Sequence, residues 1–290
     1  MREIDMVIPY VNNQDEVWRR NYLQYFARVN YKKLADMRSA RYEDIGLIYY
    51  NLRLIEKNMP FIRTIYLLLS NKEQVNHKLL PSKVKVIYHN EFIPLRFLPT
   101  FNSTTIEMFL HNIKGLSEYF IYANDDMLPV GKLKEDDFFS DDGKIKMNYR
   151  YEKYEYNPKN PFRKQCLNSY QHVSDLVGLG YGLNEFIKPD HSITPMIKSH
   201  CKYVVETLGD TIYREIRSYR THEQHNQYIY INYEIMTNNC LPSLIDFFYT
   251  EFQSEEELET FTNHQIVCLN IIPKEYNTQV IEKLESILCE

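Results

Sequence analysis

Two adjacent carboxylates, Asp125 and Asp126, directly follow a short apolar run in the first half of the chain, with Asn124 before them. The run, residues 119–122 (YFIY), is typical of a buried strand. Carboxylates at a strand end can hold a hard divalent cation, Mg²⁺ or Mn²⁺, and leave positions for water and a diphosphate. Such a cation would neutralise charge as a phosphoanhydride bond breaks. Because Asn-Asp-Asp is also ordinary turn sequence, a solvated turn is the alternative.

A third carboxylate, Glu107, stands in the segment 101–107 (FNSTTIE). We expect a helix over residues 103–113 with Ser103 as its cap. Glu107 would then lie one turn into the helix and face the same edge of the sheet as the aspartates. The alternative is an ordinary capping arrangement without chemistry.

Arginines and histidines supply candidates for phosphate binding and proton transfer. Guanidinium groups bind phosphate oxygens well, although a surface charge is the commoner explanation for any one arginine. A histidine can take the proton from an attacking hydroxyl, and spacing does not choose among the candidates. The residues that stand out are Arg38, Arg41, Arg53, Arg63, Arg217, Arg220, His191, His222 and His225.

In the first half of the chain, the segments that must position these residues alternate between strand-like and helix-like patterns. Strand-like runs cover residues 4–11, 64–69, 84–88 and 119–122, and helical patterns cover 15–29, 43–59 and 103–113. This alternation predicts an α/β fold with a mostly parallel sheet flanked by helices. Ligands bind at the carboxyl ends of strands in such sheets, where Asp125 and Asp126 fall.

The second half is less regular. Residues 132–165 predict an irregular insertion or a small antiparallel element. Residues 190–208 predict a loop and then a helix. Further helices are predicted over 241–252, 255–262 and 277–288, so the C-terminal part is mainly helical.

Composition narrows the class of protein. The chain has 290 residues, 44% of them hydrophobic and 25% charged, which is the balance of a globular protein. A net charge of −5 argues against nucleic acid as a partner. No signal segment or membrane span is evident, and five widely spaced cysteines without a CxxC pair predict free thiols in a reducing cytoplasm.

Four blocks of sequence carry a family resemblance. The first joins Ile4-Asp5 to residues 11–18, with Tyr10 and Asn12-Asn13 where the family usually has WVDG. The second and strongest runs from residue 41 to residue 126, through RYED, LRLIEK, LPTFNS and FIYANDD. The third is residues 190–195 (DHSITP), and the fourth is Tyr219-Arg220 followed by residues 226–228 (NQY). In these blocks the chain resembles the Stealth family of sugar-1-phosphate transferases.

The resemblance implies a glycosyltransferase-A-like, Rossmann-like fold, a UDP-linked or other nucleotide-sugar donor, and dependence on Mg²⁺ or Mn²⁺. It implies transfer of sugar-1-phosphate to a glycan or lipid-linked glycan, with release of nucleoside monophosphate. A single catalytic domain, 1–290, would comprise a nucleotide-sugar core (1–131), an insertion (132–189) and a helical portion that closes over donor and acceptor (190–290). A lipid-linked acceptor would bring this cytoplasmic protein to the inner face of the membrane as a peripheral protein.

The resemblance also implies a role for each site residue, according to its position in these blocks. Asp125 and Asp126 would serve the metal or the diphosphate, and His191 would be the base, with Asp126 and Glu107 completing the catalytic set. The substrate-binding set would be Asp5 and Asn12 near the nucleotide, Arg41, Arg217 and Arg220 for phosphate, and Asn102 and Asn124 lining the site. Two alternatives stay open: a metal-dependent glycosyltransferase that releases nucleoside diphosphate, and a non-catalytic sugar-binding or scaffold protein.

Overall fold

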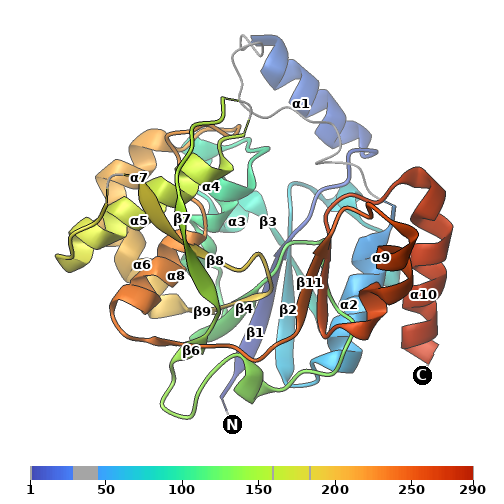
Figure 1. Ribbon diagram of the computed structural model, residues 1–290. Coiled ribbons are helices and arrows are strands. Elements are labelled where there is room, and N and C mark those ends of the chain that lie inside the picture. Colours follow the sequence, from blue (N-terminus) through green and yellow to red (C-terminus); the bar gives the residue numbers. More distant parts are fainter. Residues whose placement is uncertain (1, 29–44, 159, 183, 290) are drawn as a thin grey trace.

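The apolar runs of the first half form the central sheet of the computed structural model, which describes residues 2–28, 45–158, 160–182 and 184–289. In Figure 1 this sheet lies between a group of helices on the right (α2, α9 and α10) and a group on the left (α4 to α8), with α1 above it. The strands are β1 (Ile4–Pro9), β2 (Ile62–Leu69), β3 (Val84–Tyr88), β4 (Tyr119–Tyr122), β5 (Met127–Pro129), β6 (Ile145–Lys146), β7 (Tyr149–Lys153), β8 (Glu185–Pro189), β9 (Thr194–Ile197), β10 (Cys240–Leu241), β11 (Phe247–Thr250) and β12 (Ile266–Leu269). The α-helices are α1 (Glu16–Arg28), α2 (Leu47–Asn58), α3 (His89–Phe92), α4 (Ser103–Glu107), α5 (Phe162–Val177), α6 (Lys198–Thr207), α7 (Gly209–Glu215), α8 (Tyr228–Met236), α9 (Glu255–Thr260) and α10 (Asn277–Cys289).

The central sheet has the order β3–β2–β1–β4–β9. β1, β2, β3 and β4 pair in parallel, and β9 is antiparallel to β4. Every residue of β1 is buried, as expected of a strand covered on both faces. The predicted mostly parallel sheet is confirmed, and the carboxyl ends of its four parallel strands share one edge.

Of the three smaller sheets among the described residues, two extend the molecule beside this edge. β11, β12 and β5 form one of them, and the backbone N–H of Leu269 donates to the carbonyl of Asp126 at 2.9 Å. β7 and β8 form an antiparallel ribbon (Figure 1). The C-terminal third of the chain is therefore hydrogen-bonded directly to the turn that carries the two aspartates.

Helix α2 connects the central sheet to the C-terminal part. Ile48, Leu52 and Ile55 belong to the main core, whereas Leu54 belongs to a second core shared with β5, β12 and α10. Gly46, with φ +84°, adopts the left-handed backbone that the start of this helix requires. Within the described residues, no helix has both the length and the apolar character needed to cross a membrane.

Several local predictions are wrong. Residues 241–252 contain the last residue of β10 and all of β11 instead of a helix, because β11 pairs with β12. The helix predicted over 103–113 ends at Glu107, and its cap is Asn102, whose side chain accepts from the N–H of Thr104 at 3.2 Å. β9 and the 16-residue α5 were not predicted. The predicted start of α2 at residue 43 falls outside the described residues.

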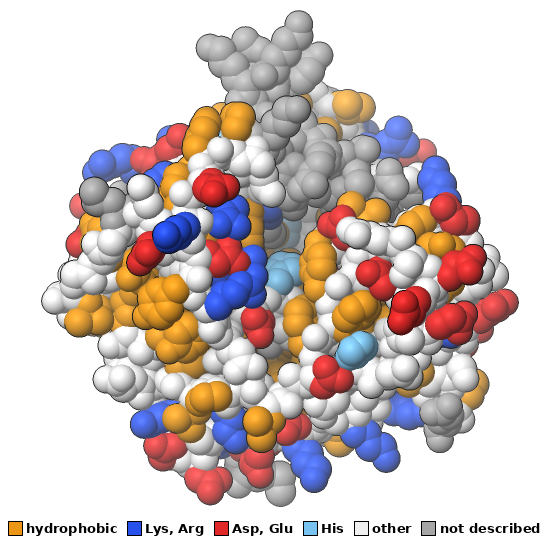
Figure 2. Space-filling view, in the orientation of Figure 1, with side chains coloured by type: hydrophobic (Ala, Val, Ile, Leu, Met, Phe, Trp, Pro, Cys, Tyr) orange, Lys and Arg blue, Asp and Glu red, His pale blue; other side chains and the backbone are white. Residues whose placement is uncertain are grey.

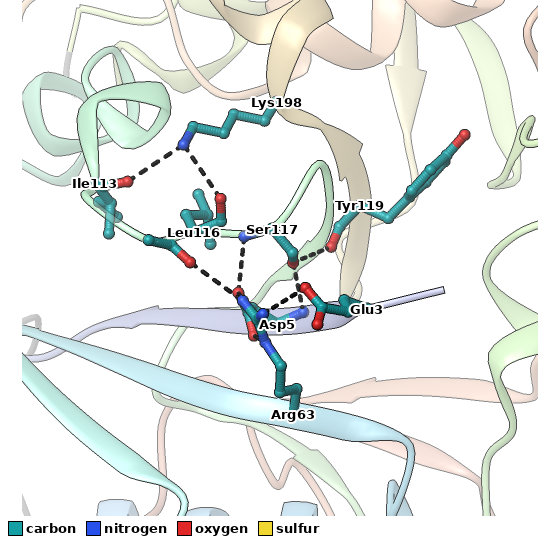
Figure 3. Close-up of polar contacts among 9 residues, drawn as sticks. Glu3, Asp5, Arg63, Ile113, Leu116, Ser117, Tyr119 and Lys198 are labelled. Atoms are coloured by element: carbon teal, nitrogen blue, oxygen red, sulfur yellow. Dashed lines mark hydrogen bonds and ion pairs between the residues drawn. The ribbon is translucent and has the colours of Figure 1, made fainter. Parts of the chain in front are cut away.

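Asp5 lies at the amino end of β1, away from the carboxyl edge of the sheet (Figure 3). Its fully buried carboxylate accepts from Arg63 Nε at 2.9 Å, from Arg63 Nη2 at 2.7 Å and from the N–H of Ser117 at 2.7 Å. The backbone N–H of Asp5 donates to Ser117 Oγ at 3.0 Å. The structure therefore does not bring Asp5 to a nucleotide site, because its carboxylate joins β1 to β2 and to the loop before β4.

We expect Asp5→Ala to lower the free energy of unfolding by about 3 kcal/mol, because it removes the buried partner of Arg63 and leaves the Ser117 amide unsatisfied. Urea denaturation measures the change. Glu3→Ala is the matched control: Glu3 pairs with the same arginine but is exposed, so its loss should cost less than about 1 kcal/mol. Equal losses in the two variants would contradict this assignment.

Candidate functional site

A cavity of about 770 Å³ opens at the carboxyl edge of the central sheet. Its walls come from the end of β1, the turn after β4, helix α4, the β7–β8 ribbon, residues 220–228 and the ends of β11 and β12. Figure 2 shows this face hollowed at its centre, with basic side chains gathered on one wall. The described residues from the sequence-predicted set that line it are Asn102, Glu107, Asn124, Asp125, Asp126, His191 and Arg220.

The carboxylate turn at residues 124–126 is held by its backbone. The fully buried Asn51 of α2 donates from Nδ2 to the carbonyls of Asp125 at 3.0 Å and Met127 at 3.1 Å. The hydroxyl of Tyr122 donates to Asn124 Oδ1 at 3.0 Å. These bonds go mostly to main-chain carbonyls. The side chains of Asp125 and Asp126 are half-buried and form part of the cavity wall.

The buried thiol of Cys268 in β12 lies against the Asp126 side chain. Burial and the negative charge of Asp126 raise the pKa of this thiol well above its usual value, so it stays protonated. All five cysteines are free thiols, as predicted.

The donor set fits a cation that is shared with a ligand. No cluster of three or more histidine, cysteine or carboxylate side chains that could hold a metal is present in the part of the chain that the structure describes. Asp125 and Asp126 nevertheless supply two carboxylates in one cavity wall. Mg²⁺ is commonly held by one or two carboxylates and completes its shell with water and substrate phosphates.

Glu107 is buried at the base of the cavity. Its Oε2 accepts from the N–H of Gln227 at 2.7 Å, and its Oε1 lies 3.4 Å from the Tyr122 hydroxyl oxygen. Arg220 donates from Nη2 to Ser103 Oγ at 2.7 Å, and Ser103 is hydrogen-bonded to Glu107. Burial raises the pKa of Glu107 above its usual range, although the nearby positive charge of Arg220 opposes the shift. Glu107 and Ser103 thus hold the guanidinium group of Arg220 beside the cavity.

We expect Glu107→Gln to gain stability relative to the wild type as pH rises from the usual glutamate range upward. A raised folded-state pKa means that the protonated carboxyl contributes stability that is complete below the unfolded pKa and is lost as pH rises through the folded pKa. The glutamine variant has no such loss. Thermal melting across this range measures the difference, with the exposed Glu259→Gln as control. A difference that does not change with pH would contradict the burial effect.

Asn102 connects helix α4 to the segment that carries Arg220. Besides capping α4, its Nδ2 donates to the carbonyls of Arg217 at 3.3 Å and Tyr219 at 3.1 Å. The side chain of Arg217 instead donates to the carbonyls of Arg214 and Ile216, and it does not line the cavity. Of the two predicted arginines in this segment, the structure brings Arg220 to the site and leaves Arg217 outside.

The three candidate histidines are separated by the fold. His191 lines the cavity, with Nδ1 at 3.3 Å from the Tyr228 hydroxyl and its ring packed against Phe162 and Tyr249. His222 contacts the carbonyl of Asn157 outside the cavity. His225 is buried, with Nε2 at 2.7 Å from Nδ1 of His172, and burial lowers its pKa to about 3.

For two further residues, Asn12 and Arg41, the structure does not support the predicted place in the site. Asn12 is engaged locally: its N–H donates to Gln74 Oε1 and its Oδ1 accepts from the N–H of Gln14, both at 2.7 Å. Its neighbours Tyr10 and Val11 line the cavity, whereas Asn12 does not. Arg41 lies outside the described residues, as does Arg38.

Sequence reasoning missed a basic wall on the β7–β8 ribbon. Arg150 and Lys188 line the cavity and both pair with Glu152, at 2.7 Å and 3.3 Å. Arg150 also lies 3.5 Å from Asp190. No local signal joins residue 150 to residue 188, because their proximity follows from the pairing of two strands distant in sequence. Asn226 and Gln227, by contrast, were visible in the fourth sequence block but carried no assigned role.

Comparison with known proteins places the central part of this site in a family. Residues 41–147 match the family model described as Stealth protein CR2, conserved region 2, and the match includes Glu107, Asp125 and Asp126. The chain carries this conserved region of the Stealth family. The predicted resemblance is therefore confirmed for the region that carries the carboxylates.

Several curated relatives of this chain are named phosphotransferases. The chain is 36% identical over 142 residues to the capsular polysaccharide phosphotransferase fcs1 of Haemophilus influenzae, covering 48% of this chain and 38% of that protein. It is 38% identical over 144 residues to the exopolysaccharide phosphotransferase cps2G of Lactiplantibacillus plantarum, covering 49% and 40%. It is 29% identical over 208 residues to the receptor polysaccharide phosphotransferase WefC of Streptococcus oralis, covering 72% and 60%. The matched part thus spans about two fifths of the length of the first two relatives.

Proposed function

We propose that this Stealth protein transfers a sugar-1-phosphate from a nucleotide-sugar, UDP-linked or related, to a glycan hydroxyl in capsule or other surface polysaccharide synthesis. The observation that carries the proposal is the convergence of Asp125, Asp126, Arg220 and His191 on one cavity. The names of the relatives support the reaction class. The parallel order β3–β2–β1–β4 is also that of nucleotide-binding doubly wound sheets, which supports the glycosyltransferase-A-like fold.

The proposed reaction is an in-line displacement at the phosphorus attached to the sugar. The acceptor oxygen forms a new bond to this phosphorus, and the bond to the bridging oxygen of the diphosphate breaks. The bridging oxygen leaves with the nucleoside monophosphate, and the hydroxyl proton passes to a base. Catalysis of such a step depends on positioning and on stabilisation of charge.

The described residues have distinct tasks in this proposal. Arg220, held by Ser103 and Glu107, binds non-bridging oxygens of the phosphate. His191, whose ring is oriented by Tyr228, accepts the hydroxyl proton. Asp125 and Asp126 hold the divalent cation with the diphosphate, and the bound cation supplies neutralisation of its charge. Because nucleotide sugars are cytoplasmic metabolites, we place the reaction in the cytoplasm, at the inner membrane face where the acceptor is lipid-linked.

A donor labelled at the sugar-linked phosphate tests the reaction. We expect label in the glycan product and release of nucleoside monophosphate. Release of nucleoside diphosphate, with no label in the glycan, would instead show a glycosyltransferase that attacks the anomeric carbon. Absence of turnover with every donor and acceptor pair tried would favour a non-catalytic sugar-binding protein.

A further inference from the structure

Two cations stand directly opposite each other on the β7–β8 ribbon, at the wall of the cavity. Arg150 and Lys188 are partners in the antiparallel register of this ribbon, so their side chains leave the same face. Both line the cavity, and their side chains are 54% and 19% exposed. Like charges at directly opposite positions repel and destabilise a strand pair. The ribbon therefore holds an unfavourable pair of charges where a ligand can reach it.

The neighbouring carboxylates offset this repulsion only in part. Glu152 Oε1 lies 2.7 Å from Arg150 Nη2 and 3.3 Å from Lys188 Nζ. Its Oε2 lies 2.8 Å from Nη1 of Arg163, so three cations share this one carboxylate. The second carboxylate, Asp190, lies 3.5 Å from Arg150. These five residues combine three positive charges with two negative ones, and the excess is positive.

This part of the wall adjoins the proposed base and is distinct from the surroundings of Arg220. The positive charge that acts on Glu107 is that of Arg220, whereas the positive charges that act on Asp190 are those of the ribbon. His191 follows Asp190 directly and lines the same cavity. Because the acceptor hydroxyl must reach His191 in the proposed reaction, the ribbon cations lie on the side of the acceptor.

We infer that Arg150 and Lys188 bind a phosphate group carried by the acceptor. The inference rests on the proposed function, because it names the class of acceptor for that reaction. An arginine fork can bind two phosphate oxygens, and a lysine ammonium beside it can bind a third. A bound phosphate would also remove the repulsion between the two cations.

Two kinds of acceptor present this chemistry. Transfer of a sugar-1-phosphate leaves a phosphodiester in the product, so a growing glycan would present one at each later transfer. A glycan carried on a lipid diphosphate presents phosphate oxygens at its linkage to the lipid. An uncharged glycan presents neither, and nothing in it would use the excess positive charge of the ribbon.

Binding of acceptor analogues to the purified full chain, without donor and in EDTA, tests the inference. The ligands are a short oligo(hexose-1-phosphate), an uncharged oligosaccharide of the same hexose, and this oligosaccharide on a short prenyl diphosphate. EDTA removes divalent cations, so Asp125 and Asp126 repel phosphate. We expect calorimetry to show at least one phosphate-bearing ligand binding about ten-fold or more tightly than the uncharged one, with a smaller difference at high salt.

Substitution of both ribbon cations then locates the phosphate. Arg150→Gln combined with Lys188→Gln should weaken binding of the preferred ligand by about ten-fold and remove most of its advantage over the uncharged oligosaccharide. The phosphate-bearing ligand that responds identifies the source of the phosphate. Lys153→Gln combined with Lys202→Gln is the matched control, because both lysines are exposed and outside the cavity. The control should change affinity by less than about two-fold.

The inference is overturned if the uncharged oligosaccharide binds as tightly as both phosphate-bearing ligands, or if the ribbon variant binds them as tightly as the wild type. The ribbon variant leaves Glu152 paired with Arg163. Should it nevertheless fail to fold, Arg150→Gln alone must weaken binding of the phosphate-bearing ligand for the inference to stand.

These measurements need neither donor nor turnover, so the inference and the proposed function can fail separately. Phosphate binding that depends on the ribbon, together with release of nucleoside diphosphate from the labelled donor, would refute the proposed reaction and leave the ribbon site intact. Labelled sugar-phosphate transfer that shows no preference for a phosphate-bearing acceptor, with no effect of the ribbon variant on binding, would refute the ribbon site alone.

Discussion

Replacement of Asp125 and Asp126 together by asparagine should lower the rate of sugar-phosphate transfer by at least about 10³-fold while leaving the free energy of unfolding nearly unchanged. The change removes both negative charges from the cavity wall and with them the proposed cation site. It leaves the hydrogen bonds that hold the turn, because Asn51 and Leu269 bond to main-chain carbonyls of this segment. Transfer assays with increasing Mg²⁺ or Mn²⁺, together with urea denaturation, measure both quantities.

The matched control is the adjacent pair Asp141 and Asp142, which is exposed and outside the cavity. Asparagine at both of these positions should change transfer by less than about two-fold, because their solvated charges are remote from the proposed diphosphate. If the Asp125/Asp126 double variant retained transfer within ten-fold of the wild type, the proposed cation site would be wrong. Unfolding of that variant would show that the aspartates serve the fold.

Arg220→Gln should lower kcat/KM for transfer by about 10²- to 10³-fold, and Arg220→Lys should recover only part of the loss. The arginine provides a planar fork held by Ser103 next to the buried Glu107. Lysine keeps the positive charge but cannot bind two phosphate oxygens in the same geometry. Steady-state kinetics with the nucleotide-sugar varied gives kcat and KM separately.

Arg217 provides the comparison for Arg220, because it belongs to the same segment but its side chain bonds to the carbonyls of Arg214 and Ile216 outside the cavity. Arg217→Gln should reduce kcat/KM by less than about three-fold. An equal loss in the two variants would mean that positive charge in this segment matters and the specific position of Arg220 does not.

The sequence alone determined the elements whose cause is local. The four parallel strands are short, largely apolar runs, and β1, β4 and most of β2 are buried, as such runs are where helices cover both faces of a sheet. A carboxylate pair immediately after the fourth run must then lie at the carboxyl edge. For this reason the position of Asp125 and Asp126 was predictable without any tertiary contact, and the match to Stealth conserved region 2 covers the same stretch.

Tertiary structure decided which of the remaining polar residues reach that edge. Residue type did not distinguish Arg220 from Arg217, or His191 from His225; each pair is separated by backbone direction and by packing. Asp5 belongs to the first sequence block, yet a bidentate bond to Arg63 holds it at the opposite end of β1. The bond between Ser103 and Arg220 spans 117 residues. Contacts over such separations depend on how the elements pack, and no local periodicity encodes them.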